Sequence, residues 1–433
     1  MIDSYPSHDF IKDCLKRLRL DTITGPVLLS FLNQFIGGGG NFLISVYLAR
    51  TLGLDQFGLY GIGFGVCMLY VGVGNAVILT QMVVNMADKS DKKKVAYAEG
   101  MLLSVCLLGV SLLALVAIVA IPLALLLPDF MRFLPVVFSI AIASVSLLGA
   151  EFFICHAFLR RRESMAAAVN GVTMLTIFLG FGLARLYHVD MSANLALLLY
   201  AAGTAISCFF AYLASPLKLR LRQPELLLSI SESWSYGRWA LGGVALTWLQ
   251  SQSYGYILAV YLGPAGIGLA NAARIFVSPF TFLLTSINKV AIPRLVDLRD
   301  TNRAEMFRIS MLLAGGLIAL TSLYSITLLS STEFASRIVL GRYEPAIMSV
   351  VWAWCLLLIV QVARSCGGVL LQVQRKFRLL ALVNIPSVIV TLLLSILLIH
   401  WFGVVGAILG LFAGETTLLV LIWKEIYRDK IRG

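Results

Sequence analysis

The stretch YLARTLGLDQFGLY, residues 47–60, recurs in altered form as YLGPAGIGLANAAR, residues 261–274. Three positions match at one constant offset: Leu52 with Leu262, Gly53 with Gly263, and Gly58 with Gly268. A second pair, LRRRESMAAAVNGV (159–172) and VQRKFRLLALVNIP (373–386), matches at nearly the same offset, with Arg161 on Arg375. Two matches at nearly one offset indicate two related halves. Chance similarity between apolar segments is the alternative interpretation.

The composition around these repeats is that of an integral membrane protein. Hydrophobic residues make up 59% of the chain, charged residues only 13%, and the mean hydropathy is +0.91. A soluble domain carries about 25% charged residues. The first uncharged run, Thr22–Ala49, is longer than the apolar region of a secretory signal and has no small-residue cleavage pattern after it. We therefore expect it to be retained as the first span.

Charges and turn residues divide the chain into twelve expected membrane helices, each of about the 20 residues that a bilayer core requires. The uncharged stretch Leu379–Trp423 is long enough for two spans, with HWFGVVG, 400–406, as the turn between them. The predicted spans are 24–48, 58–84, 100–127, 133–157, 166–187, 194–215, 238–261, 268–290, 307–330, 346–371, 379–400 and 404–423. The predicted fold class is an all-α membrane protein.

The distribution of Lys and Arg predicts the orientation. Segments on the side of the two termini carry 27 of the 34 basic residues, and the loops on the other side carry five. Because basic loops stay on the cytoplasmic side, both termini are expected to be cytoplasmic. The net charge of +12 then favours anionic lipid headgroups on that face, rather than nucleic acid.

Each half contains six spans, so both halves have the same orientation and are related by an axis along the membrane normal. Repeats of this kind place a substrate site at their interface and work by rocking of one lobe against the other.

The basic and apolar segment HDFIKDCLKRLRL, 8–20, predicts an interfacial helix or, equally, a plain orientation signal. The expected division is 1–23 cytoplasmic amphipathic N-terminus, 24–215 first lobe, 216–237 cytoplasmic linker, 238–423 second lobe and 424–433 cytoplasmic tail.

Several of these motifs resemble one family. YLARTLGLDQFGLYGIGF in the first half, and SYGRWALGG, AVYLGPAGIGLANAARI and IPRL (292–295) in the second, are similar to the polysaccharide-biosynthesis flippases of the O-antigen (Wzx) type. That group belongs to the multidrug/oligosaccharidyl-lipid/polysaccharide exporter superfamily. The resemblance implies two six-helix bundles in a V shape around a central cavity. It also implies transport of an undecaprenyl-pyrophosphate-linked oligosaccharide to the periplasmic leaflet of a bacterial inner membrane, alongside a polysaccharide polymerase and a chain-length regulator.

Charged residues inside spans are candidates for the site, because ionisable groups at membrane depth normally face a cavity or a partner. Arg274 is preceded by the uncharged run 239–273 and followed by the uncharged run 275–288. Its planar fork of donors suits a pyrophosphate. The alternatives are a carboxylate partner or an approach to the outer surface. Arg364 and Lys289 are further candidates for a cationic cavity, although Lys289 also fits an anchor at the interface.

Two intramembrane carboxylates are candidates for cation coupling or for counter-ions. The offset from Glu151 to Arg364 is close to that of the repeat, so they are expected at nearly equivalent places in the two lobes. They are predicted to face the cavity and to meet when its cytoplasmic side closes; separate ion pairs within each lobe are the alternative. Glu415 follows the glycines 406, 410 and 414, and is either a proton or sodium site or a counter-ion for Arg274 or Arg364. That glycine spacing favours close helix packing.

Uncharged amide side chains in the spans are expected to bind sugar hydroxyls or, as the alternative, to form interhelical hydrogen bonds. The candidates are Asn33, Gln34, Asn41, Asn75, Gln250, Gln252 and Asn271. The run GGGG, 37–40, is expected to bend the first span because each glycine weakens a helix by about 1 kcal/mol.

The remaining residues favour transport over catalysis. Seven scattered cysteines and four histidines show no metal-ligand spacing, and no cofactor is expected apart from a coupling H+ or Na+. A polymerase would be expected to have a large polar loop, whereas the longest outer loop, 331–345, is short. A cation-coupled multidrug exporter and a non-transporting assembly partner of polymerases are the other hypotheses.

Overall fold

The computed structural model describes residues 25–86, 91–219 and 224–432. Within these ranges the chain is almost entirely helical and forms no β-strand. The predicted amphipathic segment, 1–23, lies outside the described residues. Nine helices of the described part are long and apolar enough to cross a membrane. The expected all-α membrane fold is therefore confirmed.

The described residues of the first half form seven α-helices and two short irregular turns. They are α2 (Gly25–Thr51), α3 (Leu54–Gly74), the π-turn η2 (Asn75–Leu79), α4 (Thr80–Met86), α5 (Asp91–Leu126), the 3-10 turn η3 (Pro128–Phe133), α6 (Leu134–Leu159), α7 (Glu163–Leu186) and α8 (Ala193–Ala214). Together α3, η2 and α4 make the second predicted span.

In the second half, the part that the structure describes forms six helices, two of which contain a sharp turn. They are α9 (Pro224–Ile275), α10 (Ser278–Thr301), α11 (Arg303–Ser330), α12 (Thr332–Leu340), α13 (Pro345–Val373) and α14 (Phe377–Arg432). The turn in α14 falls at Gly403, where φ is 54°, inside the predicted HWFGVVG turn. The turn in α9 falls at Gly263, where φ is 69°. Both glycines occupy a backbone conformation that side chains disfavour.

The structure differs from the sequence expectations at several places. The eighth span, expected at 268–290, is broken after Ile275 and resumes at Ser278. The expected linker is helical from Pro224 onward, and the expected loop 331–345 contains α12. The glycine run 37–40 lies within the continuous helix α2, and the bend expected there stays a prediction. A Cβ on Gly40 would overlap with Met174 of α7, so this part of the run allows close packing of α2 on α7.

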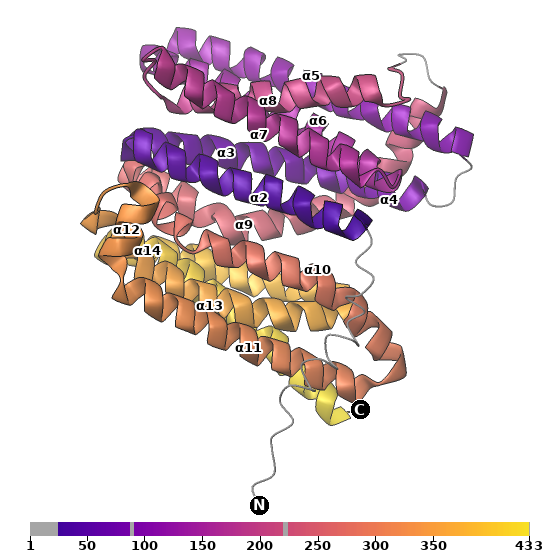
Figure 1. Cartoon of the computed structure of the whole chain (residues 1–433), viewed down its shortest axis with the longest axis vertical. Helices are drawn as coiled ribbons and strands as arrows, with labels where there is room; N and C mark the ends of the chain where they lie inside the picture. Colours follow the sequence, from indigo (N-terminus) through magenta and orange to yellow (C-terminus); the bar gives the residue numbers. More distant parts are fainter. Residues whose placement is uncertain (1–24, 87–90, 220–223, 433) are drawn as a thin grey trace, which may run out of the picture.

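The helices form two lobes, and α9 lies at the boundary between them (Figure 1). The first lobe consists of α2–α8, drawn in indigo to magenta, and the second consists of α9–α14, drawn in salmon to yellow. The helix α9 packs along α3 on one side and along α14 on the other. This long contact joins the two lobes over most of their length.

The internal repeat is visible in the backbone. Arg161 and Arg375, which match in the sequence repeat, both adopt positive φ, 53° and 61°. A Cβ on Gly203 would lie 2.8 Å from the carbonyl oxygen of Thr173, and one on Gly414 would lie 2.9 Å from that of Ser387. These pairs occupy equivalent positions in the hairpins α7–α8 and α14. The two halves therefore share local structure as well as sequence.

The motif that reveals the repeat also forms the tightest contact between the lobes. A Cβ on Gly58 of α3 would overlap with the carbonyl oxygen of Pro264, and a Cβ on Gly268 of α9 would overlap with that of Leu54. Gly58 matches Gly268 in the repeat, and Leu54 matches Pro264. The contact is therefore self-complementary, as across a two-fold axis. The shared glycines are required because backbone meets backbone here.

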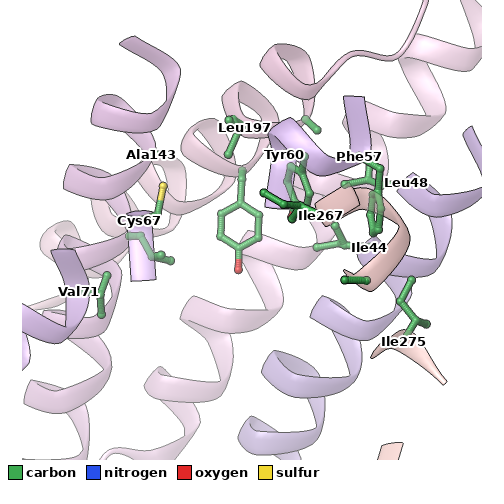
Figure 2. Close-up of a cluster of buried hydrophobic side chains, with 14 of the residues drawn as sticks. Ile44, Leu48, Phe57, Tyr60, Cys67, Val71, Ala143, Leu197, Ile267 and Ile275 are labelled. Carbon is green, nitrogen blue, oxygen red and sulfur yellow. The ribbon is translucent and has the colours of Figure 1, made fainter. Parts of the chain in front are cut away.

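The apolar core continues across this boundary. Figure 2 shows Ile44, Phe57 and Tyr60 of the first lobe beside Ile267 and Ile275 of α9. All of these residues are at most 6% exposed and belong to one cluster. The contact between the lobes at this end is therefore apolar and closely packed.

Candidate functional site

A small polar pocket interrupts this packing where α3 of the first lobe meets α9 of the second. Its free volume is about 30 Å³, and it is partly open to its surroundings. Gly61 and Gly65 of α3 form one wall, and Gln252, Tyr256 and Asn271 of α9 form the other. Because the two glycines have no side chains, the amide and hydroxyl groups of α9 fill the space. The structure thus brings together two of the predicted amides, Gln252 and Asn271.

An aromatic pair connects this pocket to Arg274. Tyr254 donates a hydrogen bond of 3.3 Å to Oδ1 of Asn271, and its ring packs edge-on against Trp354 of α13, 5.5 Å between centroids. The guanidinium carbon of Arg274 lies 5.5 Å from the centroid of the same tryptophan ring. Trp354 is held in place because its Nε1 donates to the carbonyl oxygen of Ala270 at 3.0 Å. Arg274 is therefore stabilised by a cation–π contact.

Arg274 makes no ion pair with a carboxylate in the part of the chain that the structure describes, and its side chain is exposed. Its guanidinium keeps free donors, because an aromatic face accepts none of the five in-plane N–H groups. Arg274 also directly precedes the break in the eighth span. The carbonyl oxygen of Phe276 in this break accepts from the hydroxyl of Tyr324, 2.5 Å away. Broken membrane helices of this kind occur at the substrate sites of transporters.

Arg364 and Glu415 form an ion pair within the second lobe, between α13 and α14. Nε of Arg364 lies 2.5 Å from Oε2 of Glu415, although the two atoms are not aligned as a hydrogen bond. The glutamate side chain is 5% exposed and the arginine side chain 31%. Glu415 was expected to be either a cation site or a counter-ion. In this structure it is the counter-ion of Arg364. An arginine bound in this way has fewer donors free for a substrate than Arg274.

Glu151 lies half-buried on α6 of the first lobe, at a depth where an isolated charge is costly. Among the described residues, no hydrogen bond or ion pair to its carboxylate is recorded. Arg364 is already paired in this structure, so Glu151 and Arg364 do not meet here. The meeting of these two residues in another state stays a prediction.

The other predicted polar residues lie apart from the pocket or are engaged elsewhere. Asn33 accepts a hydrogen bond of 2.8 Å from Asn170, and Asn41 accepts one of 2.7 Å from Tyr200, both within the first lobe. Gln250 is buried, and its Nε2 has no partner among the described residues. Asn75 is exposed at the start of the π-turn η2. The side chains of Gln34 and Lys289 lie outside the described residues.

Three aromatic residues of this site were not predicted from the sequence: Tyr254, Tyr256 and Trp354. Aromatic residues are common in membrane spans, so neither position nor spacing distinguishes these three. The one available signal is that Tyr254 and Tyr256 accompany Gln252 in the polar sequence QSQSYGY, 250–256. Among the described residues, no group of three or more His, Cys, Asp or Glu side chains is placed to hold a metal.

Comparisons with known proteins agree with the two-lobed helical fold. Residues 47–315, more than half of the chain, match the family described as Polysaccharide biosynthesis protein. No curated protein sequence matches the chain. The fold resembles the lipid II flippase MurJ in an inward closed conformation, with a TM-score of 0.72 and 11% identity over 93% of this chain and 87% of that one.

Two further solved structures have the same fold. One is an inward-facing multidrug resistance MATE family transporter of the MOP superfamily, with a TM-score of 0.67 and 10% identity over 92% of this chain and 95% of that one. The other is the Vibrio cholerae MATE transporter VcmN in its bent form, with a TM-score of 0.61 and 13% identity over 97% and 98%. The chain therefore belongs to the polysaccharide biosynthesis protein family and has the two-lobed helical fold of these membrane transporters.

Proposed function

We propose that the protein is a flippase that moves an undecaprenyl-pyrophosphate-linked oligosaccharide from the cytoplasmic to the periplasmic leaflet by alternating access. The observation that carries this proposal is the position of Arg274, a cation without a carboxylate partner among the described residues, beside a polar pocket built from both lobes. An anionic diphosphate supplies the acceptors that such an arginine lacks.

The parts of the site match the parts of such a substrate. The donors of Arg274 suit the pyrophosphate, and the amides of Gln252 and Asn271 suit sugar hydroxyls. The pocket is too small for an oligosaccharide in this state, with a free volume of about 30 Å³. Binding therefore requires the lobes to separate along the contact between α3 and α9, which is the rocking motion of parallel-repeat transporters.

The membrane setting of the proposal follows from the charge distribution. The excess of basic residues in the loops on the side of the termini supports cytoplasmic termini. The inner membrane of a bacterial cell is part of the proposal, in keeping with the proposed lipid-linked substrate. The substrate is then an O-antigen or another surface polysaccharide repeat unit, as in lipopolysaccharide biosynthesis. A polysaccharide polymerase and a chain-length regulator would act on the transported unit. The family membership supports polysaccharide synthesis as the general setting.

The test is transport by the purified full-length protein in proteoliposomes that contain a fluorescently labelled lipid-linked oligosaccharide. Label that has crossed to the inner leaflet is protected from a membrane-impermeant quencher. We expect Arg274→Gln to slow transport about tenfold or more, because a hydrogen bond to a charged group contributes about 1.5–3 kcal/mol. Arg274→Lys should retain part of the rate, since the charge remains.

Arg185→Gln is the matched control, because it removes one arginine at the predicted outer end of α7, away from the pocket. Equal rates for Arg274→Gln and the unsubstituted protein would contradict the proposed role of Arg274. Transport of cationic dyes without transport of the lipid-linked sugar would favour the multidrug exporter. A protein that transports neither would agree with an assembly partner of polymerases.

We further propose that Glu151, rather than Glu415, couples transport to a cation, H+ or Na+. Glu415 is already neutralised by Arg364 at 2.5 Å, whereas no partner of Glu151 is recorded among the described residues. A half-buried carboxylate without a counter-ion gains more from binding a cation than one that is paired.

A further inference from the structure

The turn between α6 and α7 differs in charge from its repeat counterpart between α13 and α14. The backbones are the same: the N–H of Arg162 donates to the carbonyl oxygen of Ala157 at 2.9 Å, and the N–H of Lys376 donates to that of Leu371 at 3.0 Å. Arg162 matches Lys376 at the same offset at which Arg161 matches Arg375. The two turns can therefore be compared position by position.

In the second lobe the cation of this turn has an acidic partner. Nζ of Lys376 lies 3.3 Å from Oε1 of Glu425 on α14, whose side chain is 13% exposed. Gly203 of α8 and Gly414 of α14 are equivalent positions. The spacing between these two glycines, applied to Glu425, gives Ala214 at the end of α8 as its counterpart. The first lobe thus keeps the basic turn but lacks the carboxylate that neutralises it.

A crevice lies at this place in the first lobe. It is lined by His156 and Ala157 of α6, Arg160 and Arg162 of the turn, Met165 of α7, and Ser215 and Pro216 after α8. Its free volume of about 10 Å³ admits a single water-sized group. One oxygen of an anion therefore fits inside, and the arginines at the rim can reach its other oxygens.

His156 forms the buried floor of the crevice. His156 is 4% exposed, and its ring stacks parallel to Phe152 with 6.2 Å between centroids. No hydrogen bond of this imidazole is recorded among the described residues. The position equivalent to His156 in the second lobe is Leu370, which offers no polar group.

Nearby carboxylates do not neutralise the two arginines. Within the described part of the chain, neither Arg160 nor Arg162 has an ion pair, and the adjacent Glu163 makes none with them. Glu99, a further acid at this end of the lobe whose side chain the structure describes, accepts a hydrogen bond of 2.9 Å from the backbone N–H of Lys218. Two positive charges therefore line the crevice without a counter-ion among the described side chains.

We propose that this crevice, with His156 at its floor and Arg160 and Arg162 at its rim, binds a phosphate group of a phospholipid headgroup or of a free phosphate. Arginine forks hold phosphate oxygens by paired, charge-assisted hydrogen bonds. The crevice lies where α6 ends, at the predicted cytoplasmic interface, which is the depth of lipid headgroups. The bound anion takes the place that Glu425 occupies in the other lobe.

The test uses the purified full-length protein and two probes. In the lipid arm, native mass spectrometry counts phosphatidylglycerol bound from mixed micelles with phosphatidylcholine as the competitor. In the soluble arm, inorganic phosphate is titrated at constant ionic strength. We expect the double variant Arg160→Gln/Arg162→Gln to weaken binding of at least one probe by about tenfold or more. The arm that responds identifies the source of the phosphate.

Arg161→Gln is the matched control, because it removes the same charge from the same turn but does not line the crevice. The proposal is overturned if Arg161→Gln weakens binding as much as the double variant, or if neither probe responds to the double variant. If the double variant does not fold, Ala214→Glu replaces it. This substitution restores the acid found in the second lobe and should abolish binding of the probe, and unchanged binding would overturn the proposal.

Discussion

Arg50 and Val339 belong to different lobes, and Nε of Arg50 donates a hydrogen bond of 2.9 Å to the carbonyl oxygen of Val339. Nη2 of the same arginine donates to the carbonyl oxygen of Ile338 at 2.5 Å. Both carbonyls belong to the last turn of α12, where no intrahelical donor is left to satisfy them. A positive charge is also favourable at this end of a helix. Arg50 therefore joins α2 to α12 at the predicted outer end.

Replacement of Arg50 by Gln is expected to favour states in which the outer ends of the lobes have separated. The loss of two charge-assisted hydrogen bonds should shift that equilibrium by about tenfold. The measurement is the distribution of distances between spin labels at Thr51 and Phe334, both of which are exposed. Arg337→Gln is the control, since Arg337 pairs with Glu333 within α12. An unchanged distribution for Arg50→Gln would show that this contact does not hold the outer end closed.

The glycine contact between the lobes predicts a difference in stability between two glycines of one motif. Gly58→Ala should destabilise the protein by about 1–3 kcal/mol, because its Cβ overlaps with the backbone of Pro264. Gly53→Ala should have little effect, since nothing lies within 4 Å of a Cβ there and φ is −68°. Thermal unfolding in detergent measures both. Equal melting temperatures for the two variants would show that the lobes adjust freely at this contact.

The ion pair in the second lobe predicts strong coupling between its members. Arg364→Gln and Glu415→Gln should each destabilise the protein by up to about 3 kcal/mol, because each leaves a partly buried charge without its partner. The arginine side chain is 31% exposed, so solvent screening reduces this cost. The double variant should recover most of the loss. Additive losses in a double-mutant cycle of thermal stability would mean that the two side chains do not interact.

If Glu151 is the coupling site, its replacement should change how transport responds to an ion gradient and leave the folding of the protein intact. Glu151→Gln should abolish the acceleration of transport by an imposed proton or sodium gradient, while transport without a gradient persists. Glu163→Gln, in the first turn of α7 at the predicted cytoplasmic end, is the matched control. The same gradient experiment applies to Glu415→Gln. Coupling that survives in Glu151→Gln but is lost in Glu415→Gln would reverse the assignment.

Most of the fold was predictable because it depends on local properties of the chain. The predicted spans agree with the observed helices to within a few residues at most ends, since an uncharged run of about 20 residues has few alternatives to a membrane helix. The turn at Gly403 was predicted because the uncharged stretch Leu379–Trp423 is too long for one span and contains the turn sequence HWFGVVG. The break after Ile275 was not predicted, although Pro279 in the first turn of α10 is a signal for it, because proline cannot continue a preceding helix without losing a hydrogen bond.

The candidate site was predictable only in part. The sequence identified Arg274, Gln252 and Asn271 by their polarity, which is unusual at membrane depth. It gave no reason to choose Trp354, which lies on another helix and far from Arg274 along the chain. The sequence also left two partners open for Glu415, and the packing of α13 against α14 selected Arg364. Helix rotation and crossing decide such contacts.

The sequence by itself determined that this is a membrane protein of two related halves, because hydropathy, charge and repeated turn glycines are properties of single segments. Only the tertiary structure decided that the repeated glycines Gly58 and Gly268 meet each other and that Arg274 lies over a tryptophan ring. It also decided that one basic turn has a carboxylate partner while its counterpart has none among the described residues. The physical reason is that these contacts join helices distant in the chain, and their partners depend on how the helices pack.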